Sequence, residues 1–310
     1  MKFIIALLVL VLVGISCTRA SPQPSVFIWN EGFDLKIGVA DLPSDNKASV
    51  KLSIPLVYYQ DSTTQSSTYN YATKILTFYG LHYADAKPIL YVVDCNTWTI
   101  VSKTGVPVEK FQYLGLASTN TSSNGLFTTV SDGNFVYPSF IDNENTINIM
   151  DAASGSYRGS VYDPNLESYF VAFRNTTGLF MRVYHVSNVF ITEFEMEFTN
   201  NISPVNDYPL NMFYNPSNRA VMAQVSMKDD NKNTFFSLAY FDWENQSFDV
   251  TRMVAVHNGQ LVTSFVPVTQ SKAYSFASVR SDYYQIYSFD TVLNQFMSYG
   301  PFYTPVSSAF

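Results

Sequence analysis

Short runs in which apolar and polar residues alternate recur along the whole chain, and they predict β-strands. Residues 221–228 show the period clearly, because the odd positions up to 227 are apolar while Gln224, Ser226 and Lys228 are polar. Met222 is the exception in this run. The runs are rich in Val, Ile, Phe and Tyr, which suit a pleated, half-buried surface. No amphipathic helix of three turns stands out in the pattern, so the sequence predicts an all-β protein.

Clusters of Asn, Ser, Asp, Gly and Pro separate these runs, and such clusters are turn signals. No block of charge and no linker composition interrupts the series, which predicts a single domain. The clearest runs cover residues 51–59, 73–79, 89–93, 134–141, 168–173, 179–184, 220–227, 235–241, 273–279 and 283–289.

The runs form a repeat in which two strands joined by a polar loop are followed by an Asp-centred turn and another strand. The side-chain oxygen of an Asp in such a turn accepts hydrogen bonds from backbone N–H groups two residues on. We therefore interpret these residues as structural turn markers and expect no catalytic group among them. The histidine in the series is a turn variant. The markers recur on average about every 50 residues and are Asp41, Asp94, Asp151, His185, Asp242 and Asp290.

A repeat of this length with about four strands is typical of propeller blades. One unit alone cannot bury both of its faces, whereas a ring of units buries both and leaves only short edges. The chain length divided by the repeat length predicts a β-propeller of six or seven four-stranded blades, the seventh hidden around residues 115–130. Residues 26–29 are expected to pair into the last blade and close the ring.

One segment carries a resemblance to a known type of repeat. Residues 135–157, FVYPSFIDNENTINIMDAASGSY, resemble the propeller repeats of the YVTN type, with an alternating strand, a polar loop and an Asp three residues before a Ser. The chain lacks the Gly-Gly of kelch repeats and the Trp-Asp of WD repeats. The resemblance implies a fold and no activity, because propellers host unrelated functions.

The first twenty residues have the features of a secretory signal peptide. Lys2 precedes the apolar run of residues 3–13, and Thr18 and Ala20 offer small side chains for cleavage after Ala20, with Ser16 or Cys17 as alternative sites. The apolar run is shorter than the ~20 residues of a membrane span. We expect residues 1–20 to be a signal peptide and residues 21–310 a single propeller domain without a membrane span. The protein is then secreted, or lies in the lumen of the secretory pathway or a vesicle.

Two further observations fit this location. Four glycosylation sequons fall in segments predicted to be turns or loops, at Asn120, Asn175, Asn201 and Asn245. The chain holds 2 cysteines, and the signal peptide removes Cys17. Cys95 then has no partner in its own chain, so the fold cannot depend on an internal disulfide. We expect Cys95 to be buried, since it follows the apolar run of residues 89–93.

Charge and motifs exclude several classes of function. The formal net charge is −7 and no basic stripe exists, so a nucleic-acid backbone would be repelled. None of the common hydrolase, zinc, redox or nucleotide-binding motifs is present, and the three histidines have no metal-ligand spacing. We expect no cofactor. Calcium is the alternative, because residues 142–145 and 229–233 are rich in oxygen ligands, although solvated hairpin tips explain them better.

The aromatic residues leave the function open. The rings of Trp29, Trp98 and Trp243 are the first candidates for a sugar-binding platform, while most Phe and Tyr residues occupy strand positions that pack sheets together. We expect a non-enzymatic binding module for an unknown protein or carbohydrate ligand. One alternative is a hydrolase or lactonase with carboxylates or calcium at the mouth of the central channel, and another is a structural matrix or coat component. Three or more converging Asp, Glu, His or Asn side chains at that mouth would favour the enzyme, and an apolar or scattered polar lining would favour binding.

Overall fold

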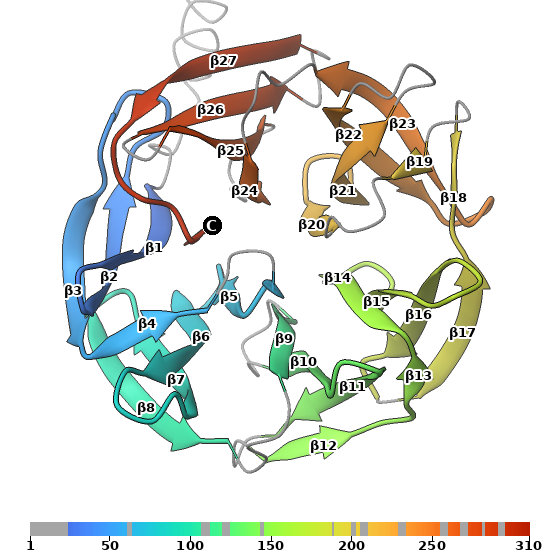
Figure 1. The fold of residues 1–310 in the computed structure, drawn as a ribbon, viewed down its shortest axis with the longest axis horizontal. Helices are drawn as coiled ribbons and strands as arrows, with labels where there is room; N and C mark the ends of the chain where they lie inside the picture. Colours follow the sequence, from blue (N-terminus) through green and yellow to red (C-terminus); the bar gives the residue numbers. More distant parts are fainter. Residues whose placement is uncertain are drawn as a thin grey trace, which may run out of the picture.

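Six small β-sheets form a ring around a central axis in the computed structural model of the chain (Figure 1). This arrangement confirms the all-β propeller and fixes the number of blades at six. Within the part of the chain described, no helix is long and apolar enough to cross a membrane. The structure describes residues 24–60, 64–106, 112–119, 125–142, 146–187, 189–199, 203–204, 210–228, 234–254, 260–266, 272–280, 283–290 and 295–310.

The blades are antiparallel sheets whose strands follow one another from the axis to the rim. Blade 1 contains, from the inside outwards, β28 (Ser308–Ala309), β1 (Ser25–Glu31), β2 (Asp34–Ala40) and β3 (Ser49–Pro55). In blade 2 the innermost position is shared by β4 (Val57–Tyr59) and β5 (Ser67–Asn70), followed by β6 (Ile75–His82), β7 (Pro88–Asp94) and β8 (Thr99–Gly105). Blade 3 contains β9 (Gln112–Ser118), β10 (Leu126–Ser131), β11 (Phe135–Ile141), β12 (Ile147–Ile149) and the short β13 (Ala153–Ser154), which also pairs with β11.

The second half of the ring repeats this order. Blade 4 contains β14 (Ser156–Asp163), β15 (Ser168–Arg174), β16 (Leu179–His185) and β17 (Phe190–Glu195). Blade 5 contains β19 (Ser203–Pro204) and β20 (Asn211–Asn215), which both pair with β21 (Ala220–Lys228), then β22 (Thr234–Asp242), β23 (Ser247–Val254) and the parallel edge strand β18 (Glu197–Phe198). Blade 6 contains β24 (Gln260–Phe265), β25 (Lys272–Arg280), β26 (Tyr283–Asp290) and β27 (Gln295–Phe302).

The two ends of the described chain close the ring within blade 1. Ala309 of β28 pairs with Phe27 of β1, and the backbones of Val26 and Phe310 exchange two hydrogen bonds of 2.9 Å. The strands β1, β2 and β3 come first in the chain and leave the innermost position of blade 1 empty, and β28 from the C-terminal end of the chain fills it. The pairing therefore differs from the expectation that residues 26–29 would join the last blade, because the last residues join the first blade instead.

Aromatic side chains fill the spaces between neighbouring blades. Phe27 of blade 1 contacts the rings of Phe276 and Phe302 of blade 6 at 5.7 and 5.3 Å between centroids. Phe127 of blade 3 stacks on Tyr169 of blade 4 at 4.9 Å. Each ring is almost fully buried, so the abundant Phe and Tyr residues serve mainly as the packing between sheets.

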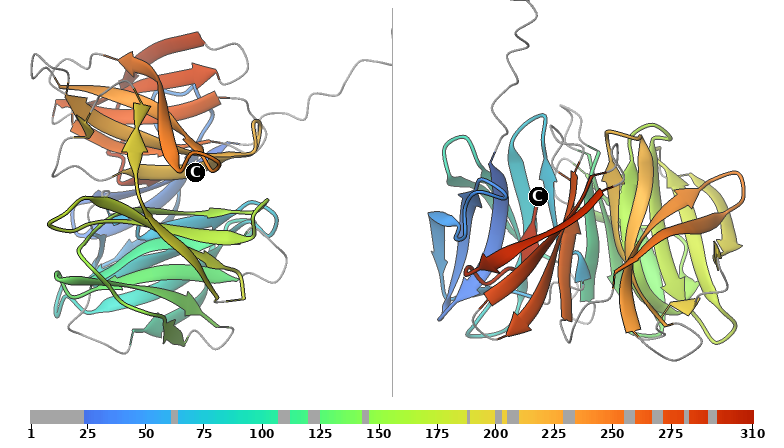
Figure 2. Two further views of the ribbon diagram at one scale, coloured as in Figure 1. Left: turned by 90° about the vertical axis from the view of Figure 1, so that its right-hand side faces the viewer. Right: turned by 90° about the horizontal axis from the view of Figure 1, so that it is seen from above.

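The strand order defines two faces of the ring. Since each blade has an even number of antiparallel main strands, the innermost strands all run in the same direction along the axis. The axis is vertical in the right-hand view of Figure 2. The turns that end the innermost strands and the turns between third and fourth strands therefore lie on one face, which we call the front face. The turns between second and third strands lie on the opposite, back face.

Candidate functional site

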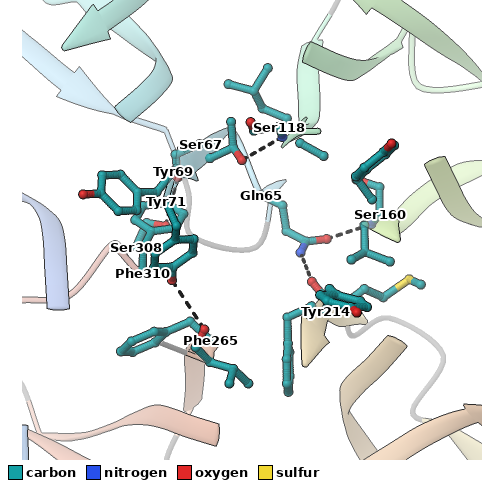
Figure 3. A pocket seen from close by; sticks show the side chains of 18 of the residues that line it. Gln65, Ser67, Tyr69, Tyr71, Ser118, Ser160, Tyr214, Phe265, Ser308 and Phe310 are labelled. Atoms are coloured by element: carbon teal, nitrogen blue, oxygen red, sulfur yellow. Dashed lines mark hydrogen bonds between the residues drawn. The ribbon is translucent and has the colours of Figure 1, made fainter. Parts of the chain in front are cut away.

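A cavity of about 520 Å³ occupies the axis of the ring, and we call it the axial pocket (Figure 3). All six blades contribute to its wall through β28, β5, β9, β14, β20 and β24 or the residues directly after them. On each of these strands the lining extends to the end of the strand, so the pocket opens at the front face. The closed ring thus builds one shared pocket from strands far apart in the sequence.

The described side chains that line the axial pocket are uncharged. It consists of aromatic and aliphatic side chains together with neutral hydroxyl and amide groups, and no Asp, Glu, Lys, Arg or His is among them. Within the described residues no three His, Cys, Asp or Glu side chains gather in a group that would hold a metal ion. The neutral polar side chains belong to Gln65, Ser67, Thr68, Ser118, Ser160, Asn211, Thr263 and Ser308.

Gln65 crosses the channel at the inner end of the pocket, and we call it the glutamine bridge (Figure 3). It lies in the interruption between β4 and β5 of blade 2, with a φ angle of +49°. Its Nε2 donates to the carbonyl of Met212 in blade 5 at 2.8 Å. Its Oε1 accepts from the Ser160 amide of blade 4 at 2.8 Å and from the Tyr157 hydroxyl at 3.1 Å. Blades 2 and 5 are opposite in a ring of six, so Gln65 links opposite sides of the channel.

Half-buried aromatic rings surround the mouth of the pocket. Tyr71, Tyr214 and Phe310 form this aromatic rim. The Tyr71 hydroxyl donates to the Val266 carbonyl of blade 6 at 3.4 Å, and the Tyr214 hydroxyl accepts from Asn165 Nδ2 at 2.6 Å. These bonds hold the two rings in place while part of each ring faces the pocket.

Two buried polar side chains in the wall have no protein partner among the described residues. Asn211 is 5% exposed and Thr263 is 9% exposed, and both line the pocket from the innermost strands of blades 5 and 6. The amide of Asn211 and the hydroxyl of Thr263 are therefore available to water or to a bound ligand.

The phenols of the pocket remain protonated in the physiological range. Burial raises the pKa of Tyr162 to about 12. Burial likewise raises the pKa of Tyr71 well above its usual value, and the nearby phenol of Tyr69 adds to this effect. The pocket therefore presents neutral hydroxyl groups rather than phenolates.

The predicted turn markers lie away from the pocket, and all except Asp151 lie on the outer part of the front face. Asp94 accepts a hydrogen bond from the Asn96 amide at 2.8 Å, and Asp242 accepts one from the Glu244 amide at 2.9 Å. His185 does the same through Nδ1, from the Ser187 amide at 3.2 Å. Asp290 ends β26 at the corresponding position of blade 6. In blade 1 the carboxylate belongs to Asp45, which accepts from the Asp41 amide at 2.8 Å.

Asp151 differs from the other markers, because it follows the fourth strand of blade 3. The turn between the third and fourth strands of this blade begins at Asp142, whose Oδ1 accepts from the Thr146 amide at 2.9 Å. The sequence repeat makes residues 134–141 the first of the two strands that precede the Asp151 marker, whereas the structure places β11 third in its blade, after β9 and β10. The stretch around β10 looked like a loop because turn residues precede it.

The turns closest to the pocket are not among the predicted turn markers, although residues 215–218 form one of the Asn- and Pro-rich clusters that predict turns. Asn70, Asp163 and Asn215 end the innermost strands of blades 2, 4 and 5, and each accepts a hydrogen bond from the amide two residues on, at 3.0, 2.8 and 3.0 Å. Pro164 and Pro216 directly follow two of them, so Asp-Pro and Asn-Pro were the available signals.

The remaining predicted residues are placed as follows. Asn175 is half-buried in the β15–β16 turn on the back face, and Asn245 is exposed in the β22–β23 turn on the front face. Cys95 is a buried free thiol, and burial raises its pKa to about 12. Asn120, Asn201, the predicted signal peptide of residues 1–20, residues 143–145 and residues 229–233 lie outside the described residues.

The three tryptophans do not line the pocket. Trp29 is buried between blades 1 and 6, and Trp98 packs half-buried against the core between blades 1 and 2. Trp243 is 38% exposed and meets the edge of the Phe170 ring at 5.7 Å. The aromatic groups that face the pocket are tyrosines and phenylalanines instead.

Comparison with known proteins places the chain in a fold class. No protein-family model and no curated protein matches the sequence. The fold is similar to that of a chain in the crystal structure of a nidogen/laminin complex, with a TM-score of 0.57, 9% identity and coverage of 92% of this chain and 97% of that chain. It is also similar to TolB from Acinetobacter baumannii, with a TM-score of 0.53, 12% identity and coverage of 89% and 67%.

These comparisons and the strand order define the protein as a six-bladed β-propeller. At such low identity the likeness shows the fold alone. The narrower resemblance to YVTN-type repeats has no matching family behind it.

Proposed function

We propose that this chain is a secreted glycoprotein that acts as a non-enzymatic binding module, with its ligand, a protein or a carbohydrate, held in the axial pocket. The observation that carries the proposal is the lining, in which six blades present uncharged polar and aromatic groups around one cavity. Its volume of about 520 Å³ lies within the range of roughly 300–1,000 Å³ found for ligand sites.

The character of the lining supports binding over acid–base chemistry. General acids and bases are groups whose pKa lies near the working pH. The described lining presents amides, aliphatic hydroxyls and phenols with raised pKa values, such as Tyr162 at about 12. These groups donate and accept hydrogen bonds without changing charge, which suits recognition.

Secretion and glycosylation are supported by the chain itself. The apolar segment near the N-terminus has the pattern of a signal peptide. Asn175 and Asn245 lie in turns, where a glycan has room. Mass spectrometry of secreted protein before and after enzymatic deglycosylation should show a loss of mass at these asparagines. An unchanged mass would contradict this part of the proposal.

A pair of matched variants tests the binding site. Ala72 is exposed at the mouth of the pocket beside the aromatic rim, and Ala84 is exposed in a turn on the back face. Ala72→Trp should cover the mouth without entering the core, while Ala84→Trp makes the same change away from it. On arrays of glycans and peptides, Ala72→Trp should lose the ligands that wild type and Ala84→Trp retain. Equal binding by all three proteins would overturn the proposal.

A further inference from the structure

We infer that the axial pocket is a blind site that takes the terminal residue of an uncharged glycan end-on. The inference rests on the proposed function and gives the class of ligand and its direction of entry. Three features carry it: the glutamine bridge that closes the channel, the placement of aromatic and polar groups along the pocket, and the neutral lining.

The glutamine bridge makes the pocket blind. Gln65 is bonded to blade 4 and blade 5 through its side chain, and its carbonyl accepts from the Leu116 amide of blade 3 at 2.8 Å. The part of each innermost strand that lines the pocket begins at the level of these contacts, at Leu116, Ser160 and Asn211. This side chain therefore obstructs the axis against a polymer that would thread through it. A ligand longer than the pocket must present one of its ends to the front face.

The wall matches the two kinds of surface that a sugar ring offers. The C–H groups of a sugar ring carry a slight positive charge, and the faces of aromatic rings are negative. The half-buried rings of Tyr71, Tyr214 and Phe310 supply such faces at the mouth. Deeper in, the unpartnered Asn211 amide and Thr263 hydroxyl are suited to bond ring hydroxyls. Both an amide and a hydroxyl can donate and accept hydrogen bonds, so each can bind a sugar hydroxyl that acts as acceptor or as donor.

The absence of charge in the described lining decides between ligand classes. A buried charge without a partner is costly, and the described side chains of the lining supply neither a cation nor an anion. The end of a peptide chain carries an ammonium or a carboxylate group, so entry of a peptide end would bury a charge. The non-reducing end of a neutral glycan carries only hydroxyls. The chain's net charge of −7 further opposes glycans that end in acidic sugars.

The experiment uses the secreted full-length protein on an array with three kinds of probe. The first are neutral glycans with a free non-reducing end, the second are the same glycans capped by an acidic sugar, and the third are peptides with free ends. Thr263→Val is the main variant, because it removes the hydroxyl and keeps the shape of the side chain. Since that hydroxyl has no described protein partner, the unfolding midpoint should stay at the wild-type value.

The expected result is pocket-dependent binding of neutral glycans, with little binding of their capped forms. Thr263→Val should weaken this binding by roughly three- to tenfold, the effect of losing one hydrogen bond. Ala72→Trp should abolish it, and Ala84→Trp should leave it unchanged. The free monosaccharide that matches the terminal residue should compete with the glycan.

Other outcomes overturn the inference and can be told apart. Pocket-dependent binding of peptides or of acid-capped glycans would overturn it and leave the proposed binding function standing. Equal binding of a glycan whose terminal residue is blocked would exclude end-on entry. Binding that Ala72→Trp does not reduce would overturn both the inference and the proposed function.

Discussion

Replacement of Gln65 by alanine removes the side chain that joins opposite sides of the ring. Three hydrogen bonds are lost, to the Met212 carbonyl, the Ser160 amide and the Tyr157 hydroxyl, at 2.8, 2.8 and 3.1 Å. A typical hydrogen bond contributes about 0.5–1.5 kcal/mol net. Water in the pocket can replace part of this set, because the site lines a cavity. We therefore expect Gln65→Ala to lower the free energy of unfolding by about 1–3 kcal/mol.

Gln246 provides a matched control for this substitution. Its φ angle is +51°, close to the +49° of Gln65, but it is exposed in the β22–β23 turn. Gln246→Ala therefore keeps the backbone conformation and removes no bond across the channel. Only Gln65→Ala removes the hydrogen bonds across the channel, so the difference in unfolding free energy between the two alanine variants measures the contribution of these bonds.

Glycine at the same two positions separates the backbone from the bridge. A left-handed conformation costs a residue other than glycine roughly 1–2 kcal/mol, and glycine avoids this cost but gains freedom in the unfolded chain. Gln65→Gly should therefore lose less stability than Gln65→Ala. The gain in unfolding free energy from the alanine to the glycine variant should be similar at position 246, where the side chain makes no bond across the channel.

Urea unfolding of the wild type and the four variants measures these differences from the unfolding midpoints at a common slope. The reasoning is refuted if Gln65→Ala and Gln246→Ala agree within about 0.5 kcal/mol, the size of an ordinary surface effect. In that case the side chain would not hold the channel closed, and the blind pocket would lose its floor.

The remaining predictions concern titration, reactivity and packing. Burial raises the pKa of Asp163, so the ionised carboxylate destabilises the folded protein at neutral pH. Asp163→Asn should therefore raise the melting temperature at neutral pH, and this gain should shrink as the pH falls through the pKa of Asp163 in the folded protein. The hydrogen bond from the Asn96 backbone amide lowers the pKa of Asp94, so Asp94→Asn should lower the melting temperature at neutral pH. Melting temperatures that shift in the same direction in Asp163→Asn and Asp94→Asn would contradict this account. The Cys95 thiol, with a pKa of about 12, should resist a thiol reagent at pH 8 until urea unfolds the protein, and prompt labelling of the native state would disprove its burial. A Cβ at Gly159 would collide with the Leu210 backbone oxygen of blade 5, so Gly159→Ala should cost about 1–3 kcal/mol of stability. Gly105→Ala, where a Cβ would meet no neighbour, should cost far less.

The fold was largely predictable because its signals are local. Alternation of apolar and polar residues marks strands, and Asp-centred turns such as those of Asp94 and Asp242 recur at one place in each blade. The register failed in blade 3, where the marker is Asp142 and β10 lies among turn residues. The count of six blades needed the closure of the ring, since β28 joins strands almost the whole chain away.

The axial pocket was not predictable from the sequence. Its lining comes from six separate strands, and residues such as Asn211 and Thr263 lie outside the clearest runs that predicted strands. The glutamine bridge lies in a polar stretch with no motif, and its role arises only when blades 2 and 5 face each other. The tryptophans drew attention as possible platforms, but packing between blades and surface contacts account for them.

The central claim is that the axial pocket receives the end of a neutral glycan above Gln65. A crystal structure of the secreted protein grown with the neutral oligosaccharide that binds best on the array tests it most directly. The account predicts the terminal sugar ring in the pocket, within hydrogen-bond distance of Asn211 and Thr263, with the Gln65 side chain still joined to Met212 and Ser160. A sugar bound elsewhere on the ring, or a chain passing through an opened channel, would contradict it.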